Sequence, residues 1–149
     1  MTAAGLAARC VELLGVVEGP IVVVAPSRVA AAIAARLDVA GVNGAAGGAV
    51  CVFLGARLDP TARAATLDAL AARMPRGTVL VVADHNQPRA RWRRLAGTLA
   101  LAFHGHGPAR ARHPVAREVR AHGFAIERLR LADGERVQLV LARRRDRDD

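Results

Sequence analysis

The side chains best suited to acid–base chemistry are Asp84, His85 and Asn86, which follow an apolar run at 78–83 that predicts a buried strand. A histidine at the carboxyl end of a strand could act as general base toward an oxygen nucleophile, because its ordinary pKa lies near neutrality. Asp84 and Asn86 could orient His85 or contact a substrate. The alternative is a polar cluster that stabilises the loop and caps the next helix, with Asp84 in a structural role.

Three further histidines, His104, His106 and His113, flank a stretch rich in glycine and proline. They could bind a metal ion, but carboxylates at metal-ligand spacing do not accompany them. We therefore predict no metal site. His104 and His106 are instead assigned to a surface loop or to a lid that contacts the substrate.

A basic run comprises Arg89, Arg91, Arg93 and Arg94, with Trp92 among them. The arginines could contact phosphates while Trp92 stacks on a base. In the alternative, Trp92 packs inward and the arginines are solvated. We favour this alternative because no recognised RNA-binding motif is present.

Composition indicates one α/β domain with a real core. The chain has 149 residues and is 52% hydrophobic, which excludes a disordered protein. Residues 1–84 carry a net charge of +1 and residues 85–149 a net charge of +8. Such a positive field could attract nucleic acid, acidic lipid or an acidic protein, or could simply be a solvated surface.

Cys10 and Cys51 lie in apolar runs without metal-ligand or CxxC spacing. We expect free, buried thiols in a reducing compartment. The N-terminus does not resemble a signal peptide, and no apolar stretch reaches the roughly 20 residues of a membrane span. These observations predict a soluble cytoplasmic protein that does not bind membranes.

The hydrophobic periodicity alternates between helices and strands. Ser27 is the expected N-cap of the second helix, and Asp59 and Pro60 begin the third. Residues 38–48 read as a glycine-rich loop in which 39–42 could form a brief edge strand, and Asp133-Gly134 as a hairpin turn. Helices are predicted at 3–14, 29–37, 62–74, 89–103 and 113–122, and strands at 21–25, 50–54, 78–83, 124–131 and 137–143.

This order predicts an α/β fold, with a mostly parallel sheet covered by helices on both faces and a C-terminal antiparallel β-hairpin. Ligands of such sheets bind at the carboxyl ends of the strands. One domain is expected over 1–143, followed by a charged tail at 144–149.

Three segments, in order, resemble the late half of class I S-adenosylmethionine-dependent methyltransferases, which have a Rossmann-like fold. They are Met-Pro-Arg-Gly-Thr at 74–78, the strand Val-Leu-Val-Val-Ala-Asp-His at 79–85, and His-Gly-Phe-Ala-Ile-Glu-Arg-Leu-Arg-Leu at 122–131. That family has a Pro-Gly turn before its fifth strand, a Gly-Phe turn before its sixth and a closing β-hairpin. The resemblance covers about 95 residues, 49–143.

The front half departs from the family, which places an acidic, glycine-rich loop after its first strand. Here residues 24–29 contain no glycine, and only twelve residues separate Leu37 from Val50. One helix–strand unit is therefore expected to be missing. The resemblance implies S-adenosylmethionine as cofactor, near Ala25, Pro26, Ser27, Asn43 and Gly55.

Three functions follow as hypotheses. The first is methyl transfer from S-adenosylmethionine to a small molecule, with an atypical cofactor site and His85 as the candidate base. The second is a catalytically inactive methyltransferase-like subunit that associates with a protein partner or with itself, as a homo- or hetero-oligomer. The third is a basic RNA-binding module on the same scaffold.

Overall fold

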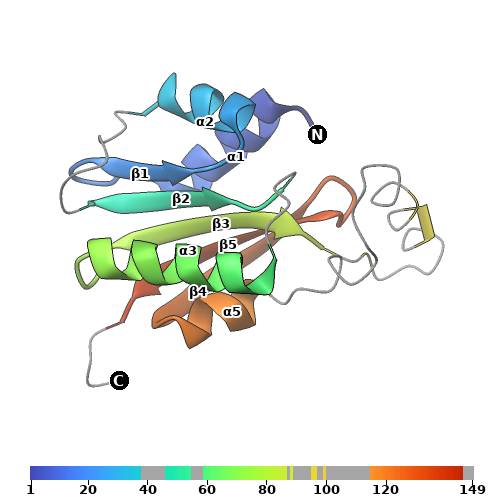
Figure 1. Ribbon diagram of the computed structural model, residues 1–149. Coiled ribbons are helices and arrows are strands. Elements are labelled where there is room, and N and C mark those ends of the chain that lie inside the picture. The colour runs from blue at the N-terminus through green and yellow to red at the C-terminus, as the bar shows by residue number, and fades with distance from the viewer. Residues whose placement is uncertain are drawn as a thin grey trace.

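The sheet contains three apolar strands that alternate with helices along the chain, followed by a C-terminal β-hairpin. In this computed structural model, residues 1–37, 46–54, 59–86, 88, 95–96, 99 and 115–145 are described. The five strands lie in the order β1-β2-β3-β5-β4 (Figure 1). They are β1 (Ile21–Val24), β2 (Gly48–Val52), β3 (Val79–His85), β4 (Phe124–Ala132) and β5 (Val137–Arg144).

The strands β1, β2 and β3 are parallel, and β5 runs antiparallel to both of its neighbours, β3 and β4. The hairpin turn between β4 and β5 lies at the predicted place. Asp133, Gly134 and Glu135 have φ values of 51°, 62° and 72°, the left-handed backbone that such tight turns require. The predicted α/β fold with a reversed C-terminal strand is confirmed.

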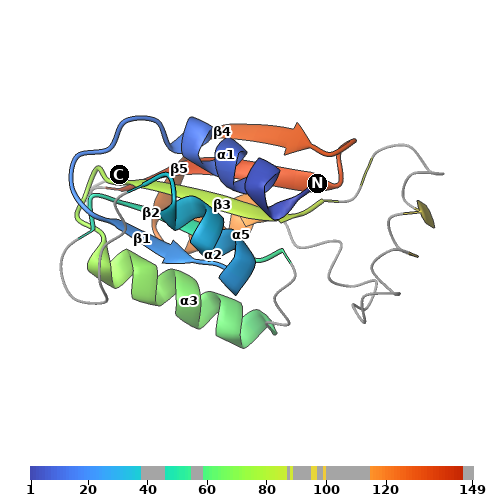
Figure 2. The same ribbon diagram turned by 90° about the horizontal axis from the view of Figure 1, so that it is seen from above.

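Helices cover both faces of the sheet, as Figures 1 and 2 show. The helices α1 (Ala3–Leu14) and α2 (Ser27–Ala34) pack on one face, against Val50, Val81 and Leu139. The helices α3 (Pro60–Arg73) and α5 (Val115–Ala121) pack on the other, against Leu80 and Val140. Alternate residues of each central strand thus enter opposite cores. Among the described helices, none combines the length and the apolar character that a membrane crossing needs.

Several predicted boundaries were wrong, among them the end of α2 at Ala34 instead of 37 and the end of β2 at Val52 instead of 54. The strand β3 extends through Asp84 and His85, expected in a loop, because these residues pair with Gln138 and Val137 of β5. The strand β2 begins at Gly48, two residues earlier than expected.

The N-cap of α2 is Pro26, and Ser27 is the first helical residue instead of the cap. The Pro26 carbonyl accepts hydrogen bonds from the N–H groups of Val29 and Ala30, both at 2.9 Å. The ring of Pro26 fixes its φ (−54°), and with a ψ of 144° this residue precedes the helix without a side-chain cap.

Several predictions fall outside the described residues, among them the edge strand at 39–42 and the helix at 89–103. The missing helix–strand unit concerns residues 38–49, of which only 46–49 are described. Within the described part, β1 pairs with β2 alone and forms one edge of the sheet.

Both cysteines are buried and free, as predicted. Burial raises the pKa of each thiol from 9.0 to about 12. A raised folded-state pKa stabilises the protein below the unfolded pKa, and this contribution is lost as the pH rises from about 9 toward 12. We therefore expect the free energy of unfolding to fall by roughly 1.4 kcal/mol per thiol for each pH unit above 9.

Urea unfolding at pH 8 and pH 10 measures this effect. The double variant Cys10→Ala/Cys51→Ala is the control and should lose less stability between the two pH values than the parent. An equal loss in both proteins would contradict the assignment.

Candidate functional site

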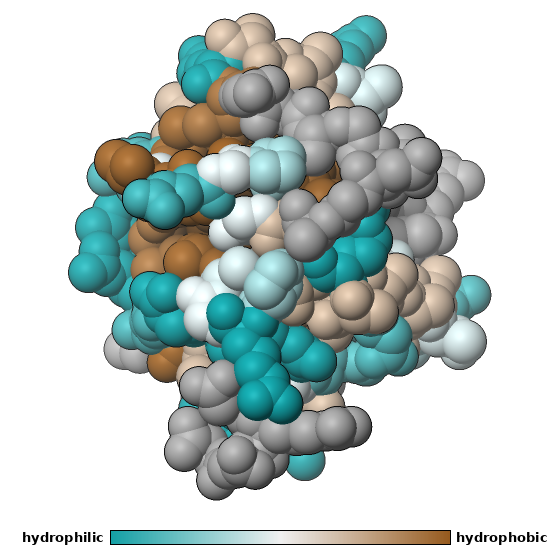
Figure 3. All heavy atoms as spheres, turned by 90° about the vertical axis from the view of Figure 1, so that its left-hand side faces the viewer, coloured by the Kyte–Doolittle hydropathy of each residue, from teal (hydrophilic) through white to brown (hydrophobic). Residues whose placement is uncertain are grey.

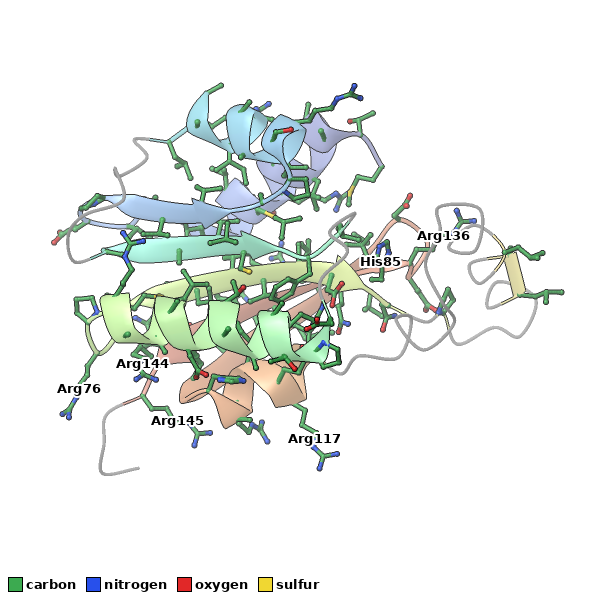
Figure 4. All side chains as sticks on the ribbon, viewed as in Figure 1. Arg76, His85, Arg117, Arg136, Arg144 and Arg145 are labelled. Carbon is green, nitrogen blue, oxygen red and sulfur yellow. The ribbon has the colours of Figure 1, made fainter. Side chains whose placement is uncertain are left out.

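The candidate site lies at the carboxyl-terminal edge of the sheet, which is formed by the ends of the parallel strands β1, β2 and β3. Polar side chains from two parts of the chain lie there, because Ser27 follows β1 while Asp84 and His85 end β3. Ala25 and Pro26 lie beside Ser27 in the same turn. Figure 4 shows His85 at this end of β3, near Arg136 of the hairpin. Because such edges bind ligands in open α/β sheets, this arrangement is the site that the fold favours.

The backbone of His85 is held by side chains of two neighbours. Its N–H donates to Oδ1 of Asp84 at 2.7 Å, and its carbonyl accepts from Nε2 of Gln138 at 2.9 Å. His85 itself is half-buried. By strand alternation, its side chain lies on the face covered by α1, whereas Asp84 lies on the face covered by α3 and α5.

The next residue, Asn86, links the end of β3 to the β4–β5 hairpin turn through hydrogen bonds. Its N–H donates to the Arg136 carbonyl at 2.7 Å, and its Nδ2 donates to the Glu135 carbonyl at 2.8 Å. Asn86 therefore fixes the path of the chain as it leaves β3. This role is structural, and contact with a substrate stays a prediction.

A buried ion triad lies beneath this edge. The Nη2 atom of Arg63 donates to Oδ2 of Asp84 and to Oε2 of Glu118, each at 2.6 Å. The side chains of Arg63, Asp84 and Glu118 are 1%, 3% and 24% exposed. The Arg63 guanidinium also stacks over the Phe53 ring, 4.0 Å from its centroid. One cation thus joins α3, β3, α5 and the residue that follows β2.

Burial alone would lower the pKa of Arg63, but hydrogen bonds and charge from Glu118 and Asp84 outweigh it and raise the pKa above its ordinary value. The guanidinium is therefore a permanent charge. A buried charge of this kind is tolerated only because it is paired on several sides.

Arg63, Glu118 and Phe53 were missed in the sequence. A signal for Arg63 was present, since it stands four residues before Leu67 and seven before Leu70, on the apolar stripe of α3. A charge inside such a stripe predicts a buried partner. Nothing comparable marks Glu118.

The predicted cofactor residues Ala25, Pro26 and Ser27 all lie at the β1–α2 turn. Ser27 is exposed, and the first N–H groups of α2 have no acceptor inside the helix. The positive end of the helix dipole therefore faces the same edge as His85, where it could bind a carboxylate. β2 lies between the two groups, so the structure brings them to one edge but not into contact.

Other predicted residues fall outside the described part of the chain. These are Asn43, Gly55, His104, His106, His113 and the basic segment at 89–94. Among the residues that are described, no group of three or more His, Cys, Asp or Glu side chains is placed to hold a metal ion.

The opposite end of the sheet carries arginines with structural contacts. Figure 3 shows that end, where apolar and polar side chains intermingle, and Figure 4 places Arg76, Arg144 and Arg145 near it. The Nη1 atom of Arg144 donates to the carbonyls of His122 and Gly123, both at 3.0 Å, and so caps the end of α5. Part of the C-terminal arginine excess therefore stabilises the fold.

Comparison with solved structures shows which known fold this arrangement resembles. No family model and no curated protein sequence matches the chain. The solved structure of the pyocyanin biosynthetic protein PhzM is similar over 85% of this chain, with 16% identity and a TM-score of 0.58. The N-methyltransferase NodS from Bradyrhizobium japonicum WM9, in complex with S-adenosyl-L-homocysteine, is similar over 95%, with 11% identity and a TM-score of 0.63. This chain has a methyltransferase-like fold.

The similar solved structures differ in length. The chain spans 43% of PhzM, 56% of TnmH (14% identity, TM-score 0.63) and 87% of the NodS complex. The resemblance to class I methyltransferases is thus confirmed for the fold. The reduced cofactor half stays a prediction.

Proposed function

We propose that this methyltransferase-like chain transfers a methyl group from S-adenosylmethionine to a small-molecule acceptor. The observation that carries the proposal is the shared edge, at which the N-terminus of α2 and His85 both lie at the carboxyl ends of parallel strands. A cationic cofactor with a carboxylate tail and a nucleophilic acceptor need these two kinds of group, an anion-binding helix end and a base.

The residues of the β1–α2 turn fit the carboxylate end of the cofactor. The side chains of Ala25 and Ser27 are small, and Ser27 is exposed at the start of α2. Glycine is absent between Val24 and Val29, so side chains limit the approach of a ligand to the backbone. We therefore expect S-adenosylmethionine to bind, but weakly.

Bound S-adenosylmethionine supplies an electrophilic methyl group. His85 would accept the proton of the acceptor hydroxyl. Asp84 and Asn86 hold the backbone on either side of the imidazole. The contribution of this chain is thus mainly to orient the acceptor and to remove its proton.

Calorimetric titration with S-adenosylmethionine and S-adenosylhomocysteine tests the proposal. We expect one site per chain with a dissociation constant above about 1 μM, equivalent to less than about 8.2 kcal/mol of binding free energy. The absence of binding at millimolar ligand would overturn the proposed function.

A matched pair of variants locates the site. Ser27→Pro removes one N–H at the first helical position, where proline is well tolerated, whereas Ser27→Ala keeps that N–H. We expect Ser27→Pro to weaken binding by about 10- to 100-fold, since a hydrogen bond to a charged group contributes roughly 1.5–3 kcal/mol. Ser27→Ala should change binding little. Equal effects of both variants would place the ligand elsewhere.

An inactive subunit is the second candidate, favoured by the lack of glycine between Val24 and Val29. Its function would be association with a protein partner or with itself, through the surface that the missing front elements would leave exposed. Sedimentation analysis separates the two candidates. A stable oligomer without affinity for either ligand supports the inactive subunit, whereas submicromolar affinity for S-adenosylhomocysteine rules it out.

A further inference from the structure

We propose that Arg63 is a positioning residue for His85 and acts through the Asp84 carboxylate. This inference rests on the proposed function only in that His85 is the candidate base. The two oxygens of Asp84 divide their tasks, since Oδ2 accepts from Arg63 at 2.6 Å and Oδ1 accepts from the His85 N–H at 2.7 Å. The Asp84 carboxylate therefore links the buried Arg63 guanidinium to the backbone N–H of His85.

The end of β3 needs such support because β2 stops short of it. β2 ends at Val52, which pairs with Ala83, so Asp84 and His85 extend beyond β2. The His85 N–H is satisfied by the carboxylate of the preceding residue. If the Asp84 carboxylate turned toward water, the His85 N–H would lose this hydrogen bond, and the backbone of His85 would be less firmly positioned.

Arg63 keeps the carboxylate in place because its own position is fixed on three sides. Its guanidinium is 1% exposed, bonds Glu118 at 2.6 Å, and lies 4.0 Å from the centroid of the Phe53 ring. Phe53 in turn donates its N–H to the Ala83 carbonyl at 2.9 Å, one residue before Asp84. The cation thus contacts Asp84 in β3 and Phe53, the residue that follows β2.

The first turn of α5 belongs to the same network through Glu118. Through Arg63 and Asp84, the helices α3 and α5 and the strand β3 are therefore all linked to the His85 N–H. We therefore expect substitutions of Arg63 to change the amide exchange and amide shift of His85 more than those of residues in the middle of β3.

Nuclear magnetic resonance of the ligand-free protein tests this, with amide hydrogen exchange and the amide shift of His85 as readouts. In Arg63→Met we expect the His85 amide to exchange roughly tenfold faster or more relative to the amides of Val81 and Val82, because a hydrogen bond to a charged group is weakened. In Arg63→Lys, which keeps a charge and several donors, most of the protection should return.

Two further variants keep the test decisive. Glu118→Gln retains both Arg63 and Asp84 and should shift the His85 amide less than Arg63→Met does. Arg143→Met removes an exposed arginine paired with Glu127 and should leave the His85 amide unchanged. If Arg63→Met does not fold, Arg63→Gln replaces it as the variant without the charge.

Unchanged His85 signals in all folded Arg63 and Glu118 variants would overturn the positioning role. A uniform loss of protection along β3 would also overturn it, because that result indicates general loosening. Neither readout needs cofactor or acceptor, so failure of this inference is distinct from failure of ligand binding in the calorimetric titration.

Discussion

Replacement of Asp84 with alanine is expected to lower the free energy of unfolding by about 3–5 kcal/mol, because it removes one partner of a buried ion pair. Arg63 is 1% exposed and, among the described residues, would keep only Glu118 as a charged partner. Its guanidinium cannot lose its proton to escape the cost. For a chain of this size the melting temperature should fall by roughly 2–4 °C per kcal/mol, which urea and thermal unfolding can both measure.

Three comparison variants separate the charge effect from general damage. Glu118→Gln, at a side chain that is 24% exposed, should cost about 1 kcal/mol. Arg143→Met breaks an exposed pair and should change stability by less than about 1 kcal/mol. The double variant Arg63→Met/Asp84→Leu should recover most of the loss, since apolar side chains can replace a buried pair.

A cost for Asp84→Ala no larger than that for Glu118→Gln would show that water reaches Arg63 readily. The triad would then contribute little to stability, and the failure of the double variant to recover would point to the same conclusion.

The fold was largely readable in the sequence, because its signals are local. The apolar run at 78–83 predicts β3, and Asp133-Gly134 predicts the hairpin turn, which has the expected left-handed backbone. The cap at Asp59 was also correct, since its side chain accepts from the Ala62 N–H at 2.7 Å. Each of these features depends on neighbours within a few residues.

Boundaries that depend on distant partners were not readable. The last two residues of β3 are strand because β5, more than 50 residues later, pairs with them. The start of α2 shifted by one residue because the backbone of Pro26 already provides the conformation that a cap needs.

Only part of the candidate site could be predicted from the sequence, because some of its residues are marked by local signals and others depend on distant partners. Asp84 and His85 stand out as polar residues after an apolar run. Arg63, which determines the environment of Asp84, lies 21 residues earlier, and Glu118 lies 55 residues after Arg63. Only the packing of α3 and α5 on one face of the sheet brings them together.

His85→Gln is expected to lower the rate of methyl transfer by about 10²–10⁴-fold, the usual contribution of a general base. S-adenosylhomocysteine affinity should stay unchanged, because the β1–α2 turn and His85 are separated by β2. The assay follows the transfer of a labelled methyl group from S-adenosylmethionine to a panel of small phenols. His122→Gln is the matched control, since this histidine pairs with Asp68, which is exposed, on the α3–α5 side.

The pH dependence distinguishes a base from a residue that only shapes the site. With His85 as base, kcat/KM should rise with pH as the base loses its proton, and this limb should disappear in His85→Gln. A variant that loses rate but keeps the limb would assign the base to another group. If kcat stays constant while KM increases, His85 contributes binding alone, because an interaction lost equally from ground state and transition state leaves kcat unchanged.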